Sequence, residues 1–303
     1  MEKVLVLLST YNGEKYISEQ LDSVLAQYGV SVSVLIRDDG SSDKTIEILK
    51  KYSGRYDNIE YFQGENIKSA QSFLQLISLA KDYPYYALCD QDDVWEKNKL
   101  LCAVNELQKM NNDVPLLYYS NLKVVDEKLD FIRLAHDKPH VQKNKYSSLV
   151  EPIMTGCTGV FNLTAKRYIE RKIPEYCSMH DTWIYMICKV FGEVYYDFTP
   201  HILYRQHGNN VIGAYKKRDV SLYIERLRRL LDRNLQPRYK NAINFYECFS
   251  DVMDDTTLDK VNKIINYKNS ALSMFRLLCD RDLCASSFSR DLRNKFLIIA
   301  KLL

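Results

Sequence analysis

Three carboxylates stand within four positions directly after an apolar run. The run is Tyr85 to Cys89, short enough for one buried strand, and the acids that follow it are Asp90, Asp92 and Asp93. Like charges packed at a strand end raise one another's pKa unless a cation lies between them. Oxygen ligands suit a hard divalent ion such as Mg²⁺ or Mn²⁺, which takes its remaining ligands from water and a diphosphate. The pattern indicates a metal–diphosphate site; an acidic turn capping the helix from about Glu96 is the alternative.

Two further polar clusters follow apolar runs nearer the N-terminus. The run Lys3 to Ser9 ends in Thr10-Tyr11-Asn12-Gly13, and the run Val32 to Ile36 ends in Arg37-Asp38-Asp39-Gly40. Apolar residues at helical spacing follow each cluster, so the chain reads as alternating strands and helices. This order predicts an α/β fold with a Rossmann-like, doubly wound, mostly parallel sheet. Ligands of such sheets bind beyond the carboxyl ends of the strands, where we expect the three clusters to meet.

Composition excludes several classes of protein. The sequence has no Gly-x-Gly-x-x-Gly after its first strand and no Gly-Lys-Ser/Thr P-loop, which disfavours dinucleotide dehydrogenases and P-loop NTPases. Lys and Arg total 42 against 39 Asp and Glu, a balance that gives no reason to expect nucleic acid as a partner. The eight cysteines are scattered, as expected for buried free thiols in a reducing compartment. Without a signal-peptide pattern or an apolar stretch of about 18 residues, we expect a cytoplasmic protein.

The three clusters together resemble the nucleotide-sugar motifs of a known family. Leu8 to Gly13, Arg37 to Asp43 and Asp90 to Trp95 resemble, in this order, the motifs of family 2 glycosyltransferases with a GT-A fold. The form Asp-Gln-Asp-Asp-Val-Trp resembles the rhamnosyltransferase-like branch. The resemblance covers about residues 1–215 and implies a GT-A catalytic domain, with a nucleotide-sugar half of about 1–110 and an acceptor half of about 111–215. Residues 216–303 are left as a C-terminal helical extension.

The resemblance also implies roles for single residues of the donor side. Asp39 would recognise the imide N–H of uracil or thymine, with Asp38 as the second choice; a tight turn with a helix cap is the alternative for this pair. Asp92 would hold the metal, while Asp90 and Asp93 support it or touch the sugar. Lys68 stands where the family commonly has glycine, and either meets the diphosphate or is a solvated lysine. The full set implied for the nucleotide is Thr10, Tyr11, Asn12, Asp38, Asp39, Lys68, Asp90 and Arg205.

The acceptor side is implied by two later segments. Gly156 and Cys157 lie in a stretch that resembles the family's acceptor-side strand, where two glycines indicate close approach of a ligand or of backbone; a bulge is the alternative. Asp181 stands at the start of an amphipathic helix and by composition alone would be a cap. In the resembled family the general base stands there, and a carboxylate suits proton removal from an acceptor hydroxyl. Trp183 either stacks on a sugar or packs in the core.

A loop after the next strand carries two more candidates. Arg205 and His207 lie in the segment 204–213, which resembles the arm that closes over the donor. Arg205 is expected to meet the leaving diphosphate. His207 is expected to bind the metal or a phosphate, with a purely structural role as the alternative.

The C-terminal region reads as helical. Helices are predicted near Arg226, over 240–253, over 258–278 and over 288–303, with Pro237 breaking the pattern. The basic apolar helix near Arg226 and the tail Phe296 to Leu303 would suit an anionic membrane surface. Packing on the catalytic domain or a homodimer interface is favoured over peripheral contact with the inner face of the cell membrane.

The resemblance, together with the acidic cluster, implies an inverting, metal-dependent glycosyltransferase with Mg²⁺ or Mn²⁺ as cofactor. It would move a sugar, from dTDP-rhamnose or a UDP-sugar, onto a hydroxyl of a glycan or lipid-linked acceptor in bacterial cell-surface polysaccharide synthesis. One alternative is a non-catalytic nucleotide- or glycan-binding subunit with the same fold. Another is a sugar nucleotidyltransferase, which would need a phosphate loop richer in glycine and basic residues than Thr10 to Glu14.

Overall fold

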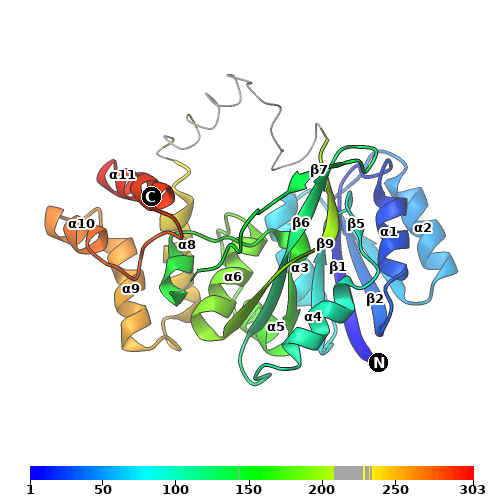
Figure 1. The fold of residues 1–303 in the computed structure, drawn as a ribbon, viewed down its shortest axis with the longest axis horizontal. Helices are drawn as coiled ribbons and strands as arrows, with labels where there is room; N and C mark the ends of the chain where they lie inside the picture. The colour runs from blue at the N-terminus through cyan, green and yellow to red at the C-terminus, as the bar shows by residue number, and fades with distance from the viewer. Residues whose placement is uncertain (143, 208–227, 229–231, 233) are drawn as a thin grey trace. The chain divides into compact units, whose positions relative to one another are not determined.

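The computed structural model describes residues 1–142, 144–207, 228, 232 and 234–303 (Figure 1). The chain divides into two compact units, each described here by itself. Unit 1 comprises Met1–Pro139, Met154–Arg171 and Met179–Gly213, and unit 2 comprises His140–Ile153, Lys172–Ser178 and Ala214–Leu303. The predicted boundary after residue 215 lies outside the described residues. Unit 2 also takes in two short segments of the predicted acceptor half, so the division of that half stays a prediction.

One sheet forms the frame of unit 1. Within the described residues it has nine strands, in the order β3-β2-β1-β4-β8-β6-β9-β5, with β7 beside β6. Its first four strands are all parallel, as the sequence predicts, and the rest mix both directions. The strands are β1 (Glu2–Thr10), β2 (Val30–Asp38), β3 (Ile59–Gln63), β4 (Tyr85–Cys89), β5 (Val94–Trp95), β6 (Leu116–Val125), β7 (Phe131–Leu134), β8 (Val160–Asn162) and β9 (Glu193–Arg205).

Helices cover the sheet because its central strands are apolar toward both faces. Every residue of β4 is buried, as are Val4 to Leu8 of β1, and α3 packs on β1 and β2 while α4 and α6 pack on β6 and β9. The helices of unit 1 are α1 (Ile17–Leu25), α2 (Thr45–Arg55), α3 (Lys68–Leu79), α4 (Lys99–Leu107), α5 (Leu163–Glu170) and α6 (His180–Phe191), with a 3₁₀ turn η2 (Gly156–Thr158). The eight cysteines are free thiols, and five of them are buried.

Unit 2 is helical. It contains the 3₁₀ helix η1 (Lys145–Leu149) and the helices α8 (Pro237–Phe249), α9 (Asp255–Asn266), α10 (Ala271–Leu278) and α11 (Phe288–Ile299). Pro237 begins α8 rather than only ending what precedes it, because the first turn of a helix needs no proline N–H. The prediction of one helix over 258–278 is wrong: α9 ends at Asn266, and the Ser270 side chain caps α10 by accepting from the N–H of Ser273. The predicted helix near Arg226 lies outside the described residues.

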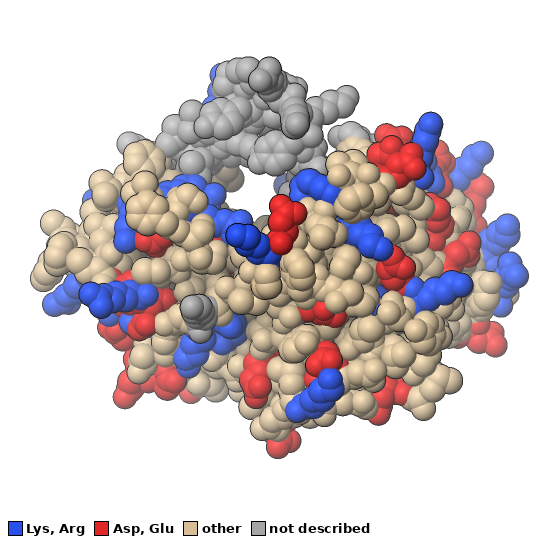
Figure 2. All heavy atoms as spheres, in the orientation of Figure 1, with Lys and Arg blue, Asp and Glu red and all other residues tan. Residues whose placement is uncertain are grey.

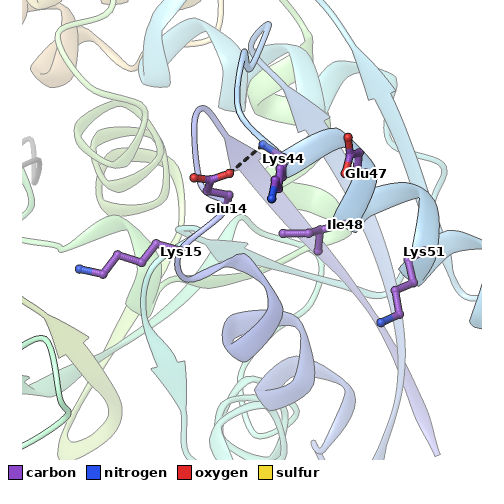
Figure 3. Close-up of a pocket in the computed structure, with 6 residues that line it drawn as sticks. All are labelled: Glu14, Lys15, Lys44, Glu47, Ile48 and Lys51. Atoms are coloured by element: carbon purple, nitrogen blue, oxygen red, sulfur yellow. Dashed lines mark hydrogen bonds between the residues drawn. The ribbon is translucent and has the colours of Figure 1, made fainter.

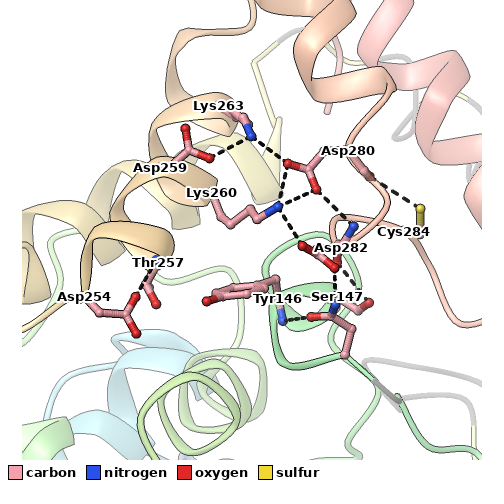
Figure 4. Close-up of polar contacts among 11 residues, drawn as sticks. Tyr146, Ser147, Asp254, Thr257, Asp259, Lys260, Lys263, Asp280, Asp282 and Cys284 are labelled. Carbon is pink, nitrogen blue, oxygen red and sulfur yellow. Dashed lines mark hydrogen bonds and ion pairs between the residues drawn. The ribbon is translucent and has the colours of Figure 1, made fainter.

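Buried ion pairs hold the helices of unit 2 together (Figure 4). The ammonium of Lys260 lies 2.8 Å from both carboxylate oxygens of Asp280 and 2.8 Å from Asp282. Lys263 adds a contact of 2.9 Å to Asp280, and Asp254 caps α9 through the N–H of Thr257. These contacts join α9 to the segment that connects α10 and α11.

Two general features concern the surface and the membrane. Acidic and basic side chains alternate over the face shown in Figure 2, in keeping with the near balance of charge in the sequence. Among the residues that the structure describes, no helix is long and apolar enough to cross a bilayer.

Candidate active site

Gln91 joins two of the three sequence motifs at the carboxyl edge of the sheet. Its Oε1 accepts a hydrogen bond from the Thr10 hydroxyl at 2.6 Å and from the Tyr11 N–H at 2.9 Å. Its Nε2 donates to the Tyr11 carbonyl at 3.2 Å. Gln91 was not among the predicted site residues, although its place between the acids of the motif was a signal. The loop after β1 and the turn after β4 are therefore held together as the sequence predicts.

The loop after β2 joins the same edge. The Asp39 N–H donates to the Thr10 carbonyl at 2.8 Å, and the Asn12 N–H donates to the Ser41 hydroxyl at 2.8 Å. The Asn12 side chain accepts in return from the N–H of Ser42 at 2.8 Å. Asn12 adopts a left-handed backbone with φ of 49°, which asparagine tolerates better than most residues. All three polar clusters thus lie together.

Asp38 and Asp39 both have partners inside the protein. Asp38 Oδ1 accepts from the N–H groups of Gly40 at 3.1 Å and Ser41 at 2.9 Å, which is the tight-turn alternative foreseen for this pair. Asp39 is 3% exposed and forms an ion pair with Arg37, itself buried. Base recognition by Asp39 therefore stays a prediction.

The acids after β4 form a crowded group. Burial, then the charge of Asp92 and then that of Asp181, raise the pKa of Asp90 to about 7. Burial and the charges of Asp92 and Asp90 raise the pKa of Asp93 well above its usual range. One ligand atom each of Asp90, Asp93 and Cys157 lie within 4.8 Å of one another. Burial also raises the pKa of Cys157, so the thiol stays protonated and suits a hard cation poorly.

His207 contacts Asp92 of this acidic turn. Its Nε2 lies 2.7 Å from Asp92 Oδ2, and its ring stacks on Tyr16 with the centroids 4.8 Å apart. The structure thus brings together the two residues predicted to hold the metal. The remainder of the segment predicted to form the arm, residues 208–213, lies outside the described residues.

The donor set fits a divalent cation. Asp93 Oδ2 is buried and has no hydrogen-bond partner among the described residues, and burial, followed by the charges of Asp92 and Asp181, raises the pKa of Asp90. Carboxylates with one imidazole are ligands that Mn²⁺ and Mg²⁺ accept. Asp92 and His207, with Asp90 beside them, are the residues that would hold the ion. The full burial of Asp93 favours a supporting role over contact with a sugar.

Arg205 holds the acidic turn in place. It is 3% exposed, and its guanidinium donates to the carbonyls of Asp92 at 2.9 Å and Glu127 at 2.6 Å while forming an ion pair with Glu19. The backbone N–H of Arg205 donates to Asp93 Oδ1 at 3.2 Å. These contacts favour a positioning role over the predicted direct contact with the diphosphate.

Asp181 lies in the first turn of α6 and is not its cap. The N-cap position is Met179, while the Asp181 carboxylate accepts from the N–H of Thr182 at 2.6 Å. Burial raises the pKa of Asp181 to about 6, partly offset by the N–H groups of Thr182 and Gly156. A Cβ on Gly156 would stand 2.7 Å from His180 Nε2, so glycine permits the approach of η2 to α6. The same Cβ would lie 3.5 Å from Asp181 Cβ, and the neighbouring Cys157 belongs to the group with Asp90 and Asp93, so η2 links Asp181 to the acidic group.

Two predicted residues stand apart from this group. The Trp183 side chain has no exposed surface, which supports core packing rather than stacking on a sugar. Lys68 is exposed at the start of α3 with φ of 67°, a left-handed backbone that favours glycine. That conformation agrees with a position where the resembled family commonly has glycine. A contact of Lys68 with the diphosphate stays a prediction.

Lys99 is a buried residue that the sequence analysis missed. Its side chain is fully buried, with Nζ 3.6 Å from the centroid of the Trp95 ring and no hydrogen-bond partner among the described residues. Burial lowers the pKa of Lys99 to about 8, opposed by the charges of Cys89, Cys157 and Asp93. The only indication in the sequence of a contact between Lys99 and Trp95 was their spacing of four positions at the start of α4.

A separate hollow on unit 1 carries none of the predicted residues. Figure 3 shows it between α2 and the loop after β1, where the Lys44 N–H donates to the Glu14 carboxylate at 2.9 Å. Its lining mixes both signs of charge: Glu14, Lys15, Lys44, Glu47, Ile48 and Lys51.

Solved structures with the same fold define the class of protein. The structure of S. aureus TarS residues 1–349 in complex with UDP-GlcNAc superposes with a TM-score of 0.54 at 17% identity, over 98% of this chain and 90% of that one. The mannosyltransferase PcManGT from Pyrobaculum calidifontis, in complex with GDP-Man and Mn²⁺, gives 0.50 at 17% identity, over 98% and 85%. The fold is that of the GT-A glycosyltransferases, as predicted.

The sequence comparison then gives the family. The model described as "Glycosyl transferase family 2" matches residues 5–171, and the chain belongs to that family. The dTDP-rhamnosyl transferase RfbG of Shigella flexneri is 29% identical over 224 residues, 68% of this chain and 74% of that protein. The uncharacterized glycosyltransferase RT0329 of Rickettsia typhi is 27% identical over 214 residues, 67% of this chain and 64% of that protein. The predicted family is confirmed.

Proposed function

We propose that this glycosyltransferase is metal-dependent and inverting, and transfers a sugar from a dTDP- or UDP-sugar to an acceptor hydroxyl. One observation carries the proposal: the turn η2 lies against both Asp181 and the acidic turn, since a Cβ on Gly156 would stand 3.5 Å from Asp181 Cβ and the Cys157 thiol lies within 4.8 Å of carboxylate oxygens of Asp90 and Asp93. A single-displacement reaction needs a general base for the acceptor hydroxyl and, close to it, a group that stabilises the negative charge of the leaving diphosphate. Asp181 and the acidic turn are those two parts.

The chain's own residues account for the proton transfer. Ionised Asp181 takes the proton of the acceptor hydroxyl while that oxygen bonds to the anomeric carbon. The bond from this carbon to the diphosphate breaks on the opposite side, so the configuration inverts. The N–H groups of Thr182 and Gly156 hold the carboxylate of the base in place. A divalent cation at Asp92 and His207 would supply positive charge to the departing diphosphate.

The donor and acceptor are proposed from the relatives and the site together. The name of RfbG supports dTDP-rhamnose as donor, and the UDP-GlcNAc complex of TarS supports a UDP-sugar as the second choice. Thr10, Tyr11 and Asp39 line the edge where the base and ribose would bind. The acceptor would be a glycan or a lipid-linked sugar of a bacterial surface polysaccharide, met in the cytoplasm beside Gly156 and Cys157.

Replacement of Asp181 tests the proposal. Asp181→Asn keeps the shape of the side chain and removes the base, so transfer should fall roughly 10²- to 10⁴-fold. Binding of dTDP or UDP should stay close to that of the parent protein. The same change at the exposed Asp57 is the matched control.

Each outcome separates the candidate functions. Retained turnover in Asp181→Asn would remove Asp181 from the base role. Nucleotide binding without transfer in the parent protein, over a panel of donors and acceptors, would favour the non-catalytic binding subunit. The family match favours glycosyl transfer over sugar nucleotidyl transfer.

A further inference from the structure

Unit 2 exposes large apolar side chains on its last two helices. Their exposed fractions run from 54% to 84%, whereas apolar side chains of this size are normally buried in cores. We call these six exposed side chains the apolar face: Leu272, Phe275, Phe288, Leu292, Phe296 and Ile299.

The helix α11 is apolar on two opposite sides. Phe288, Leu292, Phe296 and Ile299 follow one another at spacings of four, four and three, which places them on one side of the helix. The opposite side, which includes Leu297 and Ile298, is buried in unit 2. The exposed side is therefore not needed for the internal packing of α11 in unit 2.

The helix α10 continues this pattern. Leu277 is buried in unit 2. Leu272 and Phe275 are exposed and stand three positions apart, which places them on one side of the helix. The two helices contact each other within unit 2. Both of these neighbouring helices thus expose apolar side chains that the packing of unit 2 does not use.

The charged residues of α10, α11 and their connecting segment include arginines that are not in ion pairs within the described part of the chain, whereas the acids are. The acids of this region are already paired: Asp280 and Asp282 with the lysines of α9 (Figure 4), and Asp291 with Lys295 at 2.8 Å. By contrast, three exposed arginines have no ion-pair partner among the described residues: Arg276, Arg281 and Arg293. An apolar face with unpaired cations beside it complements an anionic, partly apolar partner.

We propose that the apolar face docks on an anionic phospholipid surface. The aromatic and aliphatic side chains would enter the boundary between headgroups and acyl chains, while the arginines meet the phosphates. A second copy of this chain fits less well, because a two-fold contact brings the same cations of both copies together. This inference uses no residue of the proposed reaction, so it stands or falls independently of the proposed function.

Co-sedimentation of the full chain with vesicles tests the proposal. The protein should pellet with vesicles that contain phosphatidylglycerol and stay in solution with phosphatidylcholine alone. Serine at Phe288, Leu292, Phe296 and Ile299 should abolish pelleting. Glutamine at Arg276, Arg281 and Arg293 should weaken it by about fivefold for each cation removed.

Matched variants in unit 1 are the controls. Phe131→Ser with Ile132→Ser removes two apolar side chains of similar exposure, and Lys3→Gln, Lys50→Gln and Lys128→Gln remove three exposed cations. Both sets should pellet like the parent protein. The arginine variant leaves every apolar contact in place, so it keeps the test decisive if the serine variant does not fold.

Three results would overturn the proposal. The first is absence of pelleting with either kind of vesicle, and the second is equal pelleting with both. The third is a dimer in solution that the serine substitutions dissociate, which would assign the apolar face to a second copy of the chain.

Discussion

His207 Nε2 lies 2.7 Å from Asp92 Oδ2 although 115 residues separate them in the chain. The contact joins the turn after β4 to the segment after β9, and Arg205 fastens the same two segments by donating to the Asp92 carbonyl. The candidate metal site is therefore made by two distant parts of unit 1.

The first prediction concerns His207. His207→Ala should weaken Mn²⁺ binding roughly 10- to 100-fold, because it removes one ligand and the partner of Asp92. Calorimetric titration with Mn²⁺ in the absence of nucleotide measures this directly. His136→Ala is the matched control and should bind like the parent. Unchanged affinity in His207→Ala would show that the imidazole has a structural role.

The second prediction concerns pH. Transfer requires ionised Asp181, and burial raises the pKa of that carboxyl to about 6. The value of kcat/KM should therefore rise as the pH increases through about 6 and then level off. A profile that is flat across this range, or that falls with increasing pH, would contradict a carboxylate base at position 181.

The third prediction concerns Lys99, whose pKa burial lowers to about 8. Between pH 8 and the ordinary lysine pKa the unfolded chain keeps a proton that the folded protein has lost, so stability should rise with pH. The full gain is on the order of 3 kcal/mol in the free energy of unfolding. Lys99→Met should lack this rise, as measured by urea unfolding at several pH values.

A matched substitution makes the third prediction specific. Lys97→Met alters an exposed lysine two positions away and should keep the pH-dependent rise of the parent. If Lys99→Met and the parent share one pH dependence, the ammonium of Lys99 keeps an ordinary pKa. The Lys99 ammonium would then have a hydrogen-bond or ion-pair partner that the described residues do not show.

The fourth prediction concerns Gly13. A Cβ there would stand 2.4 Å from Gln91 Oε1 and 2.9 Å from the Thr10 hydroxyl, so Gly13→Ala should displace Gln91 and weaken nucleotide binding. Gly54→Ala is the control, since its Cβ meets nothing within 4 Å and lies in a helix. It should leave binding unchanged and stabilise the protein by up to about 1 kcal/mol. Equal nucleotide affinity in both variants would contradict the role given to Gln91.

The sequence predicted those features that depend on local patterns. Apolar runs indicated the parallel strands, and the polar residues directly after them placed the loop after β1, the turn after β2 and the turn after β4 at one edge of the sheet. Asp181 was singled out by the family resemblance alone, and its role stays a prediction. The sequence pattern predicted helix boundaries less well where the end of one helix and the start of the next depend on a single capping side chain. The hydroxyl of Ser270 caps α10, and composition alone read through it as one helix over 258–278.

The sequence could not reveal which distant groups become partners. Arg37 pairs with Asp39, and the Arg205 guanidinium donates to backbone carbonyls, so two residues expected at the ligand also have contacts within the protein. Lys99 reads as an exposed helix residue by composition, yet it is fully buried against Trp95. Such pairings depend on tertiary packing, which residue types and spacing do not encode.

The most direct test of the central claim is a calorimetric titration of the protein with dTDP and UDP, each with Mn²⁺ and with a chelator. We expect one of these nucleotides to bind only with Mn²⁺, and we expect this binding to be lost in Asp92→Asn, while Asp57→Asn binds like the parent. Failure of both nucleotides to bind, or binding that neither the chelator nor Asp92→Asn weakens, would contradict a metal–diphosphate site at the turn after β4.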